Sequence, residues 1–335
     1  MFEPEISLHK IALVGVGGCG QNALDFAKAE LKDTVDYYLF DTDERGLSTQ
    51  DEITRIGIGG SVTDGRSAGA IPDIGRKAAI ESMQIMSKYL KGYDLIFCIG
   101  GLGGGTATSV LPELAKYLQT EEVITIFATT TPFDFEGRKK QRYANDAMNE
   151  IVQFGDASLI ISNQKMLESI PKSSTLLSAF NCANDVLKES VLGICSLIMN
   201  TGNINLDYAD LRSTLKNSGY AVIGKGYGKG SERIEKAMLS ALKTPLLEDY
   251  KLSTAQRVLV NITAGQDMRL DEVHQAGELI HEHISSEIPI IWGTEITDTN
   301  VDEVSIYVIL TGVKPEKDII TCDLKAFYPT GNDSL

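Results

Sequence analysis

Short runs of apolar, β-branched residues alternate with segments of helical periodicity in the first half of the chain. The runs IALVGV, YYLFD, LIFCI, VITIFAT and SLIIS predict strands. The segments between them predict helices at residues 22–31, 73–90, 108–118 and 139–153. Strands and helices in alternation are typical of a parallel sheet covered on both faces. Every glycine-rich or polar loop in this half follows a strand end, where such sheets bind ligands.

A long amphipathic segment, residues 176–199, predicts a central helix between two lobes. Beyond it, the strand patterns AVIGKG, RVLVNITA, IPIIWG and VSIYVILTG accompany two helices, at residues 231–242 and 270–284. This order predicts a second, smaller α/β domain with a mixed sheet. We therefore expect a first domain over residues 1–174, the central helix and its connection over 175–204, a second domain over 205–315 and a short tail over 316–335.

The composition is that of a globular protein and argues against two classes of partner. With 335 residues, 43% hydrophobic and 23% charged, the chain is long enough for two domains. Its formal net charge of −15 disfavours nucleic acid and anionic membranes, because both are bound through clustered Lys and Arg. The N-terminus lacks the features of a signal peptide and no apolar run could span a membrane, so we expect a cytoplasmic protein.

The segment GGLGGGTATS, residues 100–109, is the clearest candidate for chemistry. It lies between the apolar run LIFCI and a predicted helix. Glycine lets the backbone close around an anion, and a helix N-terminus favours phosphate. No Gly-Lys-Ser/Thr follows, so the segment is not a Walker P-loop. A simple helix cap with a flexible loop is the alternative, but the density of glycine favours a phosphate site.

The first strand ends in GVGGCGQNA, which satisfies the pattern G-x-G-x-x-G at Gly15, Gly17 and Gly20, and Asp41 closes the second strand. Taken alone, these features are typical of a dinucleotide site. The second glycine-rich loop favours a nucleoside triphosphate instead, because three phosphates can use two such loops. An oxidoreductase that binds NAD remains an alternative.

Two further loops follow strands at the same edge of the predicted sheet. The segment DGRSAGAIPDIG places small residues before Pro72, and TTTPFDFEGRKK places Glu136 among several cations. Each loop alone also fits a surface turn or a solvated run of charges. Together, the four loops favour one shared phosphate site.

In this order the motifs resemble those of the FtsZ and tubulin family of self-assembling GTPases, and those of its FtsZ branch in particular. GGGTAT is similar to the family's GGGTGT/S, the first loop to GxGGxGxNA, DTD to NTD, and PFDFEGRKK to PFxFEGxxR. The similarity continues through NLDYADL, TPLLEDYKL, VLVNITAG and VILTGV. The resemblance implies a tubulin/FtsZ fold with a GTP-binding first domain and a C-terminal activation domain.

The resemblance also implies which residues hold GTP or GDP, with Mg²⁺ bound through the phosphates rather than by side chains. Glu136 would hold the ribose, while Asn163 and Asn184 would hydrogen-bond guanine. An Asn amide carries both a donor and an acceptor, which suits that edge of the base. Phe180, for which core packing is the alternative, would stack on the base and shares a helix face with Asn184. The expected nucleotide contacts are Gly17, Gly18, Cys19, Gly20, Gln21, Asn22, Asp41, Ala68, Gly69, Ala70, Gly101, Leu102, Gly103, Gly104, Gly105, Thr106, Ala107, Pro132, Glu136, Lys140, Asn163, Phe180 and Asn184.

Asn205, Asp207 and Asp210, in the segment NLDYAD, are the implied catalytic residues. In the family this segment enters the nucleotide site of the next subunit, where its carboxylates orient or activate the attacking water. The resemblance therefore implies a head-to-tail homopolymer that hydrolyses GTP at the subunit interface, in cell division or in shaping membrane. Capping or turn formation is the alternative role for these residues.

The chain departs from the family pattern at three site positions. Ala107 replaces a glycine and could crowd the loop, Lys140 replaces an arginine and lacks its planar fork, and Asp41 replaces an asparagine and adds negative charge. The chain also ends soon after VILTGV, so we expect neither the linker nor the membrane-tether peptide of ring-forming relatives. A GTP- or GDP-binding regulator of a true FtsZ, with weak hydrolysis, is therefore the alternative function. A true FtsZ and a membrane tether are the alternative partners.

Overall fold

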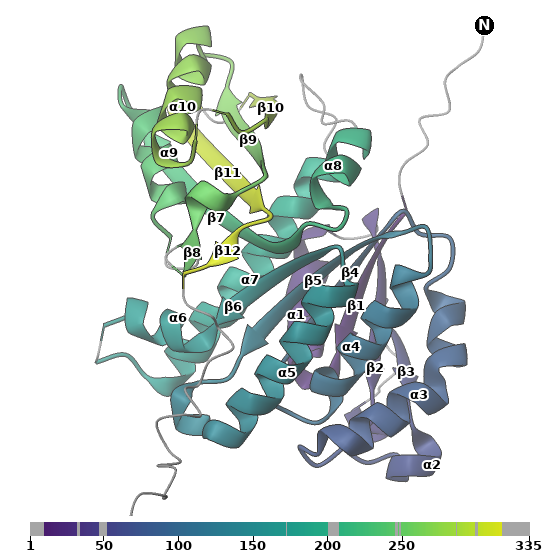
Figure 1. Cartoon of the computed structure of the whole chain (residues 1–335). Coiled ribbons are helices and arrows are strands. Elements are labelled where there is room, and N and C mark those ends of the chain that lie inside the picture. The colour runs from purple at the N-terminus through teal and green to yellow at the C-terminus, as the bar shows by residue number, and fades with distance from the viewer. Residues whose placement is uncertain are drawn as a thin grey trace, which may run out of the picture.

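The computed structural model describes residues 10–31, 34–46, 52–171, 173–199, 208–244, 247, 249–285, 287–298 and 301–316. These residues form two lobes joined by one long helix (Figure 1). Within the described ranges, no helix is both long and apolar enough to cross a lipid bilayer.

The first lobe contains a parallel sheet, as the alternating pattern predicts. Its order is β3-β2-β1-β4-β5-β6. The chain therefore leaves β1 towards one side of the sheet and returns to β4 on the other, which creates a topological switch point between these two strands. The strands are β1 (Ile11–Val16), β2 (Asp36–Asp41), β3 (Thr54–Gly57), β4 (Leu95–Gly101), β5 (Ile124–Thr131) and β6 (Ala157–Ser162).

Helices cover both faces of this sheet. The first helix, α1 (Gly17–Leu31), and the central helix, α7 (Leu176–Met199), pack on one face. The other face is covered by α3 (Pro72–Tyr89), α4 (Thr106–Gln119) and α5 (Arg138–Phe154). Successive strand residues contribute alternately to the two hydrophobic cores, because side chains on a strand point to opposite faces in turn.

Most of the predicted elements are confirmed, and the differences have local causes. The central helix has the predicted bounds, whereas α1 begins already at Gly17, so the first glycine-rich loop forms the first turn of that helix. The sequence pattern did not predict β3, because Ile56 is the single apolar residue among its four, TRIG. The sequence pattern also did not predict the short helices α2 (Gly60–Thr63), α6 (Asn163–Ser169) and α8 (Tyr208–Leu215).

The second lobe has the mixed sheet that the sequence predicts. β11 runs antiparallel to both of its neighbours, whereas β9 and β10 are parallel. β7 also pairs in parallel with β6, so the sheets of the two lobes are continuous. The strands are β7 (Gly219–Lys229), β9 (Arg257–Gly265), β10 (Ile290–Thr297) and β11 (Glu303–Thr311), and the helices that pack on them are α9 (Arg233–Leu242) and α10 (Leu270–His283).

Three glycines on β7 allow α9 to pack directly against the strand backbone. A Cβ atom on Gly224, Gly226 or Gly228 would lie 2.0, 1.8 or 1.8 Å from a backbone oxygen of α9. Because no real Cβ can occupy such a position, glycine at every second residue of the strand is a packing requirement. The repeated glycines of GKGYGK thus serve the core of the second lobe.

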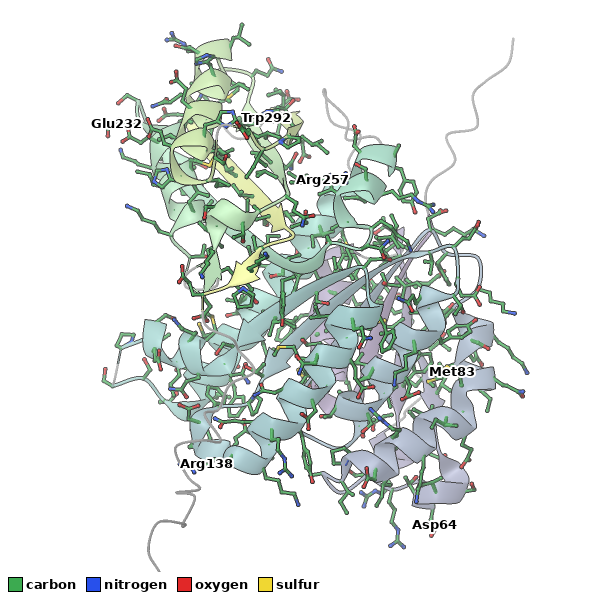
Figure 2. The ribbon with its side chains drawn as sticks, viewed as in Figure 1. Asp64, Met83, Arg138, Glu232, Arg257 and Trp292 are labelled. Carbon is green, nitrogen blue, oxygen red and sulfur yellow. The ribbon has the colours of Figure 1, made fainter. Side chains whose placement is uncertain are left out.

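We predict that Gly226→Ala lowers the free energy of unfolding of the second lobe by about 3 kcal/mol, the upper end of the usual cost of overpacking. Urea unfolding followed by the fluorescence of Trp292 measures this, because this single tryptophan lies in β10 of the second lobe (Figure 2).

Gly277→Ala is the matched control. A Cβ on Gly277, inside α10, would meet only the Trp292 ring, at an ordinary 3.5 Å. Alanine in a helix interior should raise the free energy of unfolding by up to about 1 kcal/mol. Equal destabilisation by the two substitutions would contradict the packing role of Gly226.

Candidate active site

Two helix N-termini meet at the carboxyl edge of the parallel sheet, at the switch point between β1 and β4. α1 begins directly after β1, and α4 begins after the glycine-rich loop that follows β4. The two helix starts adjoin, since a Cβ on Gly17 would lie 3.5 Å from the Cβ of Thr106. The first N–H groups of a helix have no acceptor within it, and the helix dipole adds partial positive charge there. The arrangement therefore suits a polyphosphate.

The glycines of the second loop have different structural roles. Gly103 has a φ of 101°, which a side chain would disfavour. A Cβ on Gly105 would lie 2.9 Å from the methyl group of Ala68, so this glycine allows two loops to touch. A Cβ on Gly104 would meet nothing within 4 Å. Gly104 therefore borders open space, and because it has no side chain, a ligand there could approach its backbone closely.

The loop containing Ala68, Gly69 and Ala70 lies against Gly105. Gly69 and Ala70 both have positive φ, 61° and 58°. For a non-glycine residue, this left-handed conformation costs about 1 kcal/mol or more. The strained residue is therefore in the loop expected beside the terminal phosphate.

Thr42 links this loop to the start of α4 and is a residue that the sequence analysis missed. Its buried Oγ1 accepts a hydrogen bond from the N–H of Ala68 at 3.1 Å and lies 3.0 Å from the Oγ1 of Thr106. The DTD motif, from which only Asp41 was predicted to be a nucleotide contact, was the available signal for Thr42.

Asp41 closes β2 beside Thr42 and is partly buried. Burial raises the pKa of its carboxyl group above the ordinary value, although backbone N–H groups, including that of Asp43, oppose the shift. The charged form of Asp41 is therefore disfavoured in the folded chain, because burial removes part of its hydration.

Ala107 is accommodated by the core. Its methyl group is buried among the apolar side chains between the sheet and α4. A Cβ on Gly100 would lie 2.9 Å from the Cβ of Ala107, so the glycine in β4 makes room for this alanine. The methyl group thus adds to the packing of α4, away from the open space beside Gly104.

Glu136, in the segment between β5 and α5, forms an ion pair with Lys140 in the first turn of α5. The Lys140 Nζ lies 2.8 Å from Glu136 Oε2, and Glu136 Oε1 accepts a hydrogen bond from the N–H of Phe133 at 3.0 Å. These contacts hold the predicted ribose-binding carboxylate in place. The same loop reaches the phosphate loop, because a Cβ on Gly103 would lie 3.2 Å from Pro132.

The predicted base-binding residues lie on α6 and α7. Asn163 is 9% exposed, and its Oδ1 is buried without a hydrogen-bond partner. Such an acceptor costs about 1–3 kcal/mol, so a ligand N–H group would fit here. Phe180 is 40% exposed and meets Phe133 edge to face, with 4.9 Å between ring centroids. Asn184 follows on α7, half-buried.

The remaining first-loop residues surround the start of α1. Gly18 is exposed, and a Cβ there would meet nothing within 4 Å. Gly20 is tightly packed instead, because its Cβ would lie 2.7 Å from the backbone of Gly15. Cys19 is adjacent to Gly101, and burial raises the pKa of its thiol. Gln21 and Asn22 are in the second turn of the helix.

Asp210 lies far from these loops. It is exposed on α8, and the neighbouring Tyr208 donates a hydrogen bond to the carbonyl of Asp94, which precedes β4. The phosphate loop follows the other end of β4, and seven residues of strand span about 23 Å. Figure 2 shows this separation, because Arg138, which begins α5, lies low in the view, whereas Arg257, which begins β9 in the second lobe, lies near α8. Asn205 and Asp207 lie outside the described residues.

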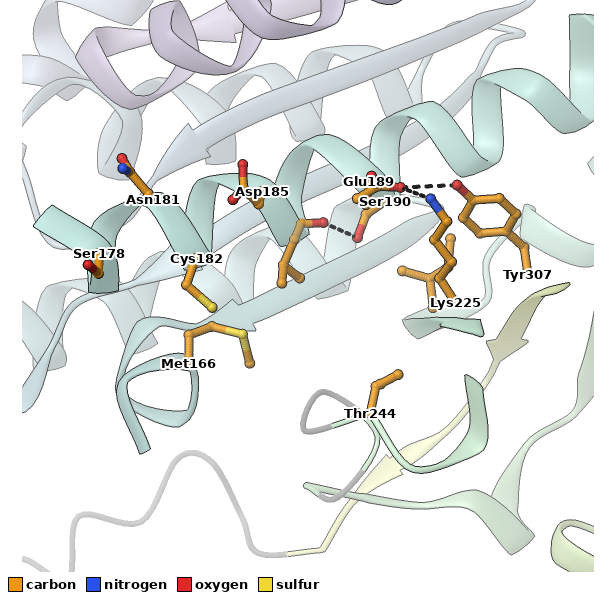
Figure 3. A pocket seen from close by; sticks show the side chains of 12 residues that line it. Met166, Ser178, Asn181, Cys182, Asp185, Glu189, Ser190, Lys225, Thr244 and Tyr307 are labelled. Atoms are coloured by element: carbon orange, nitrogen blue, oxygen red, sulfur yellow. Dashed lines mark hydrogen bonds and ion pairs between the residues drawn. The ribbon is translucent and has the colours of Figure 1, made fainter. Parts of the chain in front are cut away.

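A cavity of about 570 Å³ between α7 and the second lobe contains none of the predicted site residues. Across it, Glu189 accepts hydrogen bonds from Lys225 at 2.6 Å and Tyr307 at 3.1 Å (Figure 3). Burial acts to raise the pKa of Glu189, but the ion pair with Lys225 holds it below the ordinary value. No sequence motif marked this cavity, because it depends on how the two lobes pack.

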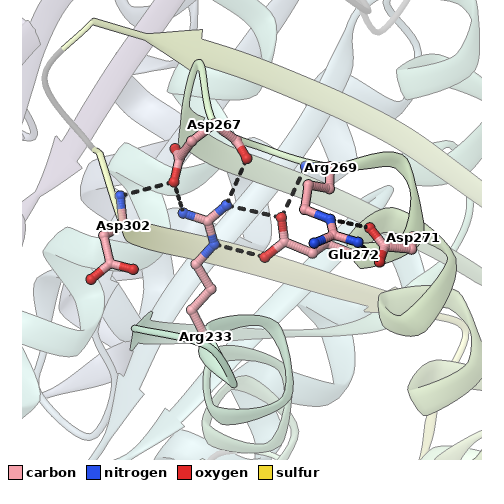
Figure 4. A network of polar contacts seen from close by, with 6 residues as sticks. All are labelled: Arg233, Asp267, Arg269, Asp271, Glu272 and Asp302. Atoms are coloured by element: carbon pink, nitrogen blue, oxygen red, sulfur yellow. Dashed lines mark hydrogen bonds and ion pairs between the residues drawn. The ribbon is translucent and has the colours of Figure 1, made fainter.

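A second polar cluster, in the second lobe, is structural. The buried guanidinium of Arg233 donates to Glu272 at 2.7 and 2.9 Å and to Asp267 at 2.6 Å (Figure 4). It thereby fixes the start of α9 to the turn before α10. Among the residues that the structure describes, no three His, Cys, Asp or Glu side chains gather closely enough to hold a metal ion. Mg²⁺ bound through phosphates stays a prediction.

Two family models match the chain. The model of the Tubulin/FtsZ family GTPase domain matches residues 10–171, and that of the FtsZ family C-terminal domain matches residues 219–314. The cell division protein FtsZ of Wigglesworthia glossinidia brevipalpis is 38% identical over 319 residues, which cover 95% of this chain and 83% of that protein.

Two solved structures of FtsZ from M. jannaschii share the fold. A tryptophan-to-tyrosine mutant is 31% identical, with a TM-score of 0.83 and coverage of 91% of each chain. An empty FtsZ dimer is 29% identical, with a TM-score of 0.83 and coverage of 98% of this chain and 95% of that one.

We predict different outcomes for alanine at two adjacent glycines of the phosphate loop. Gly105→Ala should lower the free energy of unfolding by about 1–3 kcal/mol, because its Cβ would collide with the loop at Ala68. Gly104→Ala should leave stability unchanged or slightly higher, because its Cβ meets open space. Thermal unfolding without nucleotide measures both, and a larger loss for Gly104→Ala would refute this description of the loop.

We also predict that Asp41→Asn raises the unfolding temperature at neutral pH, because the amide avoids burial of a charge. The pKa of Asp41 is raised in the folded chain, so protonation favours folding. The difference in unfolding temperature between Asp41→Asn and the wild type should therefore shrink as pH falls through the raised pKa towards about 3.9, the ordinary value for aspartate. Thermal unfolding of both proteins over this range tests the sign, and a difference that grows as pH falls would contradict it.

Proposed function

This chain belongs to the Tubulin/FtsZ family, and we propose that it binds GTP with Mg²⁺, assembles head to tail and hydrolyses GTP between two copies. One observation supports this most strongly. Asp210 is at the amino edge of the parallel sheet, whereas the phosphate loops are at its carboxyl edge. A carboxylate placed there can serve such loops only in a neighbouring molecule.

The binding half of the proposed site comes from one copy. The N-termini of α1 and α4 hold the phosphates, and Thr42 keeps the loop at Ala68 against the start of α4. Glu136 accepts from the ribose hydroxyls, and the unpaired Asn163 Oδ1 accepts from the base. Mg²⁺, if bound with the phosphates, would neutralise part of the negative charge that develops during hydrolysis.

The other half comes from the next copy along the filament. Asp207 and Asp210 orient the water that attacks the γ-phosphate, and Asn205 helps to position it. Hydrolysis of this kind depends mainly on positioning and charge, so a group supplied by a partner makes assembly a condition for turnover. A head-to-tail contact does not close on itself and therefore propagates as a filament. The FtsZ dimer that shares this fold supports association between copies.

We place this activity in the cytoplasm and in cell division, the process given in the name of the 38% identical relative; the shaping of membrane is the alternative process. A true FtsZ or a membrane tether would be further partners. The alternative, a nucleotide-binding regulator with weak hydrolysis, predicts GTP binding without filaments.

Asp210→Ala tests the mechanism. We expect this variant to bind GTP and to sediment with it, while phosphate release falls about 100-fold or more, because the water-orienting carboxylate is lost. The stable filaments that result should persist longer than those of the wild type. Loss of GTP binding would instead mean that α8 serves the nucleotide site of its own molecule.

Glu122→Gln is the control for charge at the same edge of the sheet. Glu122 is exposed just before β5, so its substitution should leave turnover unchanged. Sedimentation with GTP and with GDP completes the test. Absence of pellets at every concentration favours the regulator, and NAD released from the denatured protein would favour the dinucleotide alternative.

A further inference from the structure

The helix that holds Asp210 is attached to the nucleotide-binding lobe. α8 directly precedes β7 and lies in the segment, residues 205–315, that we assign to the second domain. Its inward face nevertheless packs on the first lobe, where Leu211 and Leu215 are buried in the core shared with α1 and α7. α8 therefore packs against the sheet of the first lobe as well as against β9 of the second lobe.

Tyr208 fastens the first turn of α8. Its Oη donates a hydrogen bond of 2.7 Å to the carbonyl of Asp94, at the amino end of β4. Tyr208, Leu211 and Leu215 recur at helical spacing and form the inward face. Asp210 lies off this face and is exposed, so the fastened helix presents its carboxylate outward.

Asp156 and Lys216 fasten the other end. The Lys216 Nζ lies 3.2 Å from the carbonyl oxygen of Val123 and 3.2 Å from Asp156 Oδ2. Asp156 is 4% exposed and also accepts hydrogen bonds from the N–H groups of Thr125 at 2.9 Å and Asn217 at 3.2 Å. This cluster joins the end of α8 to the amino ends of β5 and β6.

We propose that Tyr208 and Lys216 are positioning residues, which clamp α8 to the amino edge of the nucleotide lobe and fix Asp210 for the next copy. The inference rests on the proposed function, because it takes Asp210 to act in a neighbouring site. α8 has eight residues, too few for a stable isolated helix, so its geometry depends on such attachments. Water activation is sensitive to displacements of about 1 Å, so a loosened helix should slow turnover.

A mixture of two variants tests the clamp. The Asp210→Ala variant keeps the nucleotide site but lacks the carboxylate. The Gly104→Asp variant keeps Asp210, but the negative charge that it places in the phosphate loop should prevent GTP binding. Neither should hydrolyse GTP alone, and the mixture should. Tyr208→Phe added to the Gly104→Asp chain should lower kcat of the mixture about threefold to tenfold with KM for GTP unchanged, the effect of one lost hydrogen bond. The same change in the Asp210→Ala chain should have no effect.

Lys216 provides an independent variant. Lys216→Ala in the Gly104→Asp chain should also lower kcat, and Lys216→Arg, which can still reach a carboxylate, should restore it. Tyr307→Phe is the matched hydroxyl control, because its hydrogen bond to Glu189 lies across the cavity. This change should leave the mixture unaffected in either chain.

The outcomes separate the clamp from the proposed function. If the parent mixture releases no phosphate, hydrolysis between copies fails and the clamp fails with it. If the parents complement but Tyr208→Phe has no effect, or an equal effect in both chains, the clamp alone is wrong. A loss confined to the chain that supplies Asp210, together with rescue by Lys216→Arg, supports it.

Discussion

The polarity of the parallel sheet is the constraint on which this structure depends. All strands from β3 to β6 run in one direction, so their carboxyl ends gather the phosphate loops while their amino ends receive α8. The two edges are separated by the length of the strands, which no side chain can bridge. The predicted phosphate loops and Asp210, the proposed catalytic carboxylate, therefore lie at opposite edges of one sheet, and contact between copies is the simplest way to bring them together.

Several residues at the carboxyl edge of the parallel sheet are in energetically unfavourable states, which other contacts of the fold compensate. Asp41 is held with a raised pKa, Ala70 has a left-handed backbone, and Asn163 has a buried acceptor without a partner. Each would favour rearrangement in isolation. The close contact of Gly105 with Ala68 and Ala70 supports the left-handed residue, and Asp41 and Asn163 are held at the end of β2 and the start of α6. Such unfavourable local features are expected where a ligand completes the structure.

Much of the fold could be predicted from the sequence, because short segments of the chain carry the patterns that specify its strands and helices. The alternation of strands and helices predicted the parallel sheet, and the amphipathic period gave the bounds of α7. Motif order predicted that the phosphate loops share one edge. Contacts distant in sequence could not be predicted in this way: Thr42 with Thr106, Tyr208 with Asp94, and the cavity at Glu189 depend on tertiary packing. Asn205 and Asp207 stay predictions.

In the proposed mechanism one molecule cannot complete the hydrolytic site, so GTP turnover per molecule should depend on protein concentration. We predict turnover close to zero in dilute protein, rising steeply as copies associate and levelling off once filaments dominate. Turnover per molecule that is constant across the whole range, including concentrations at which the protein is monomeric, would contradict the account.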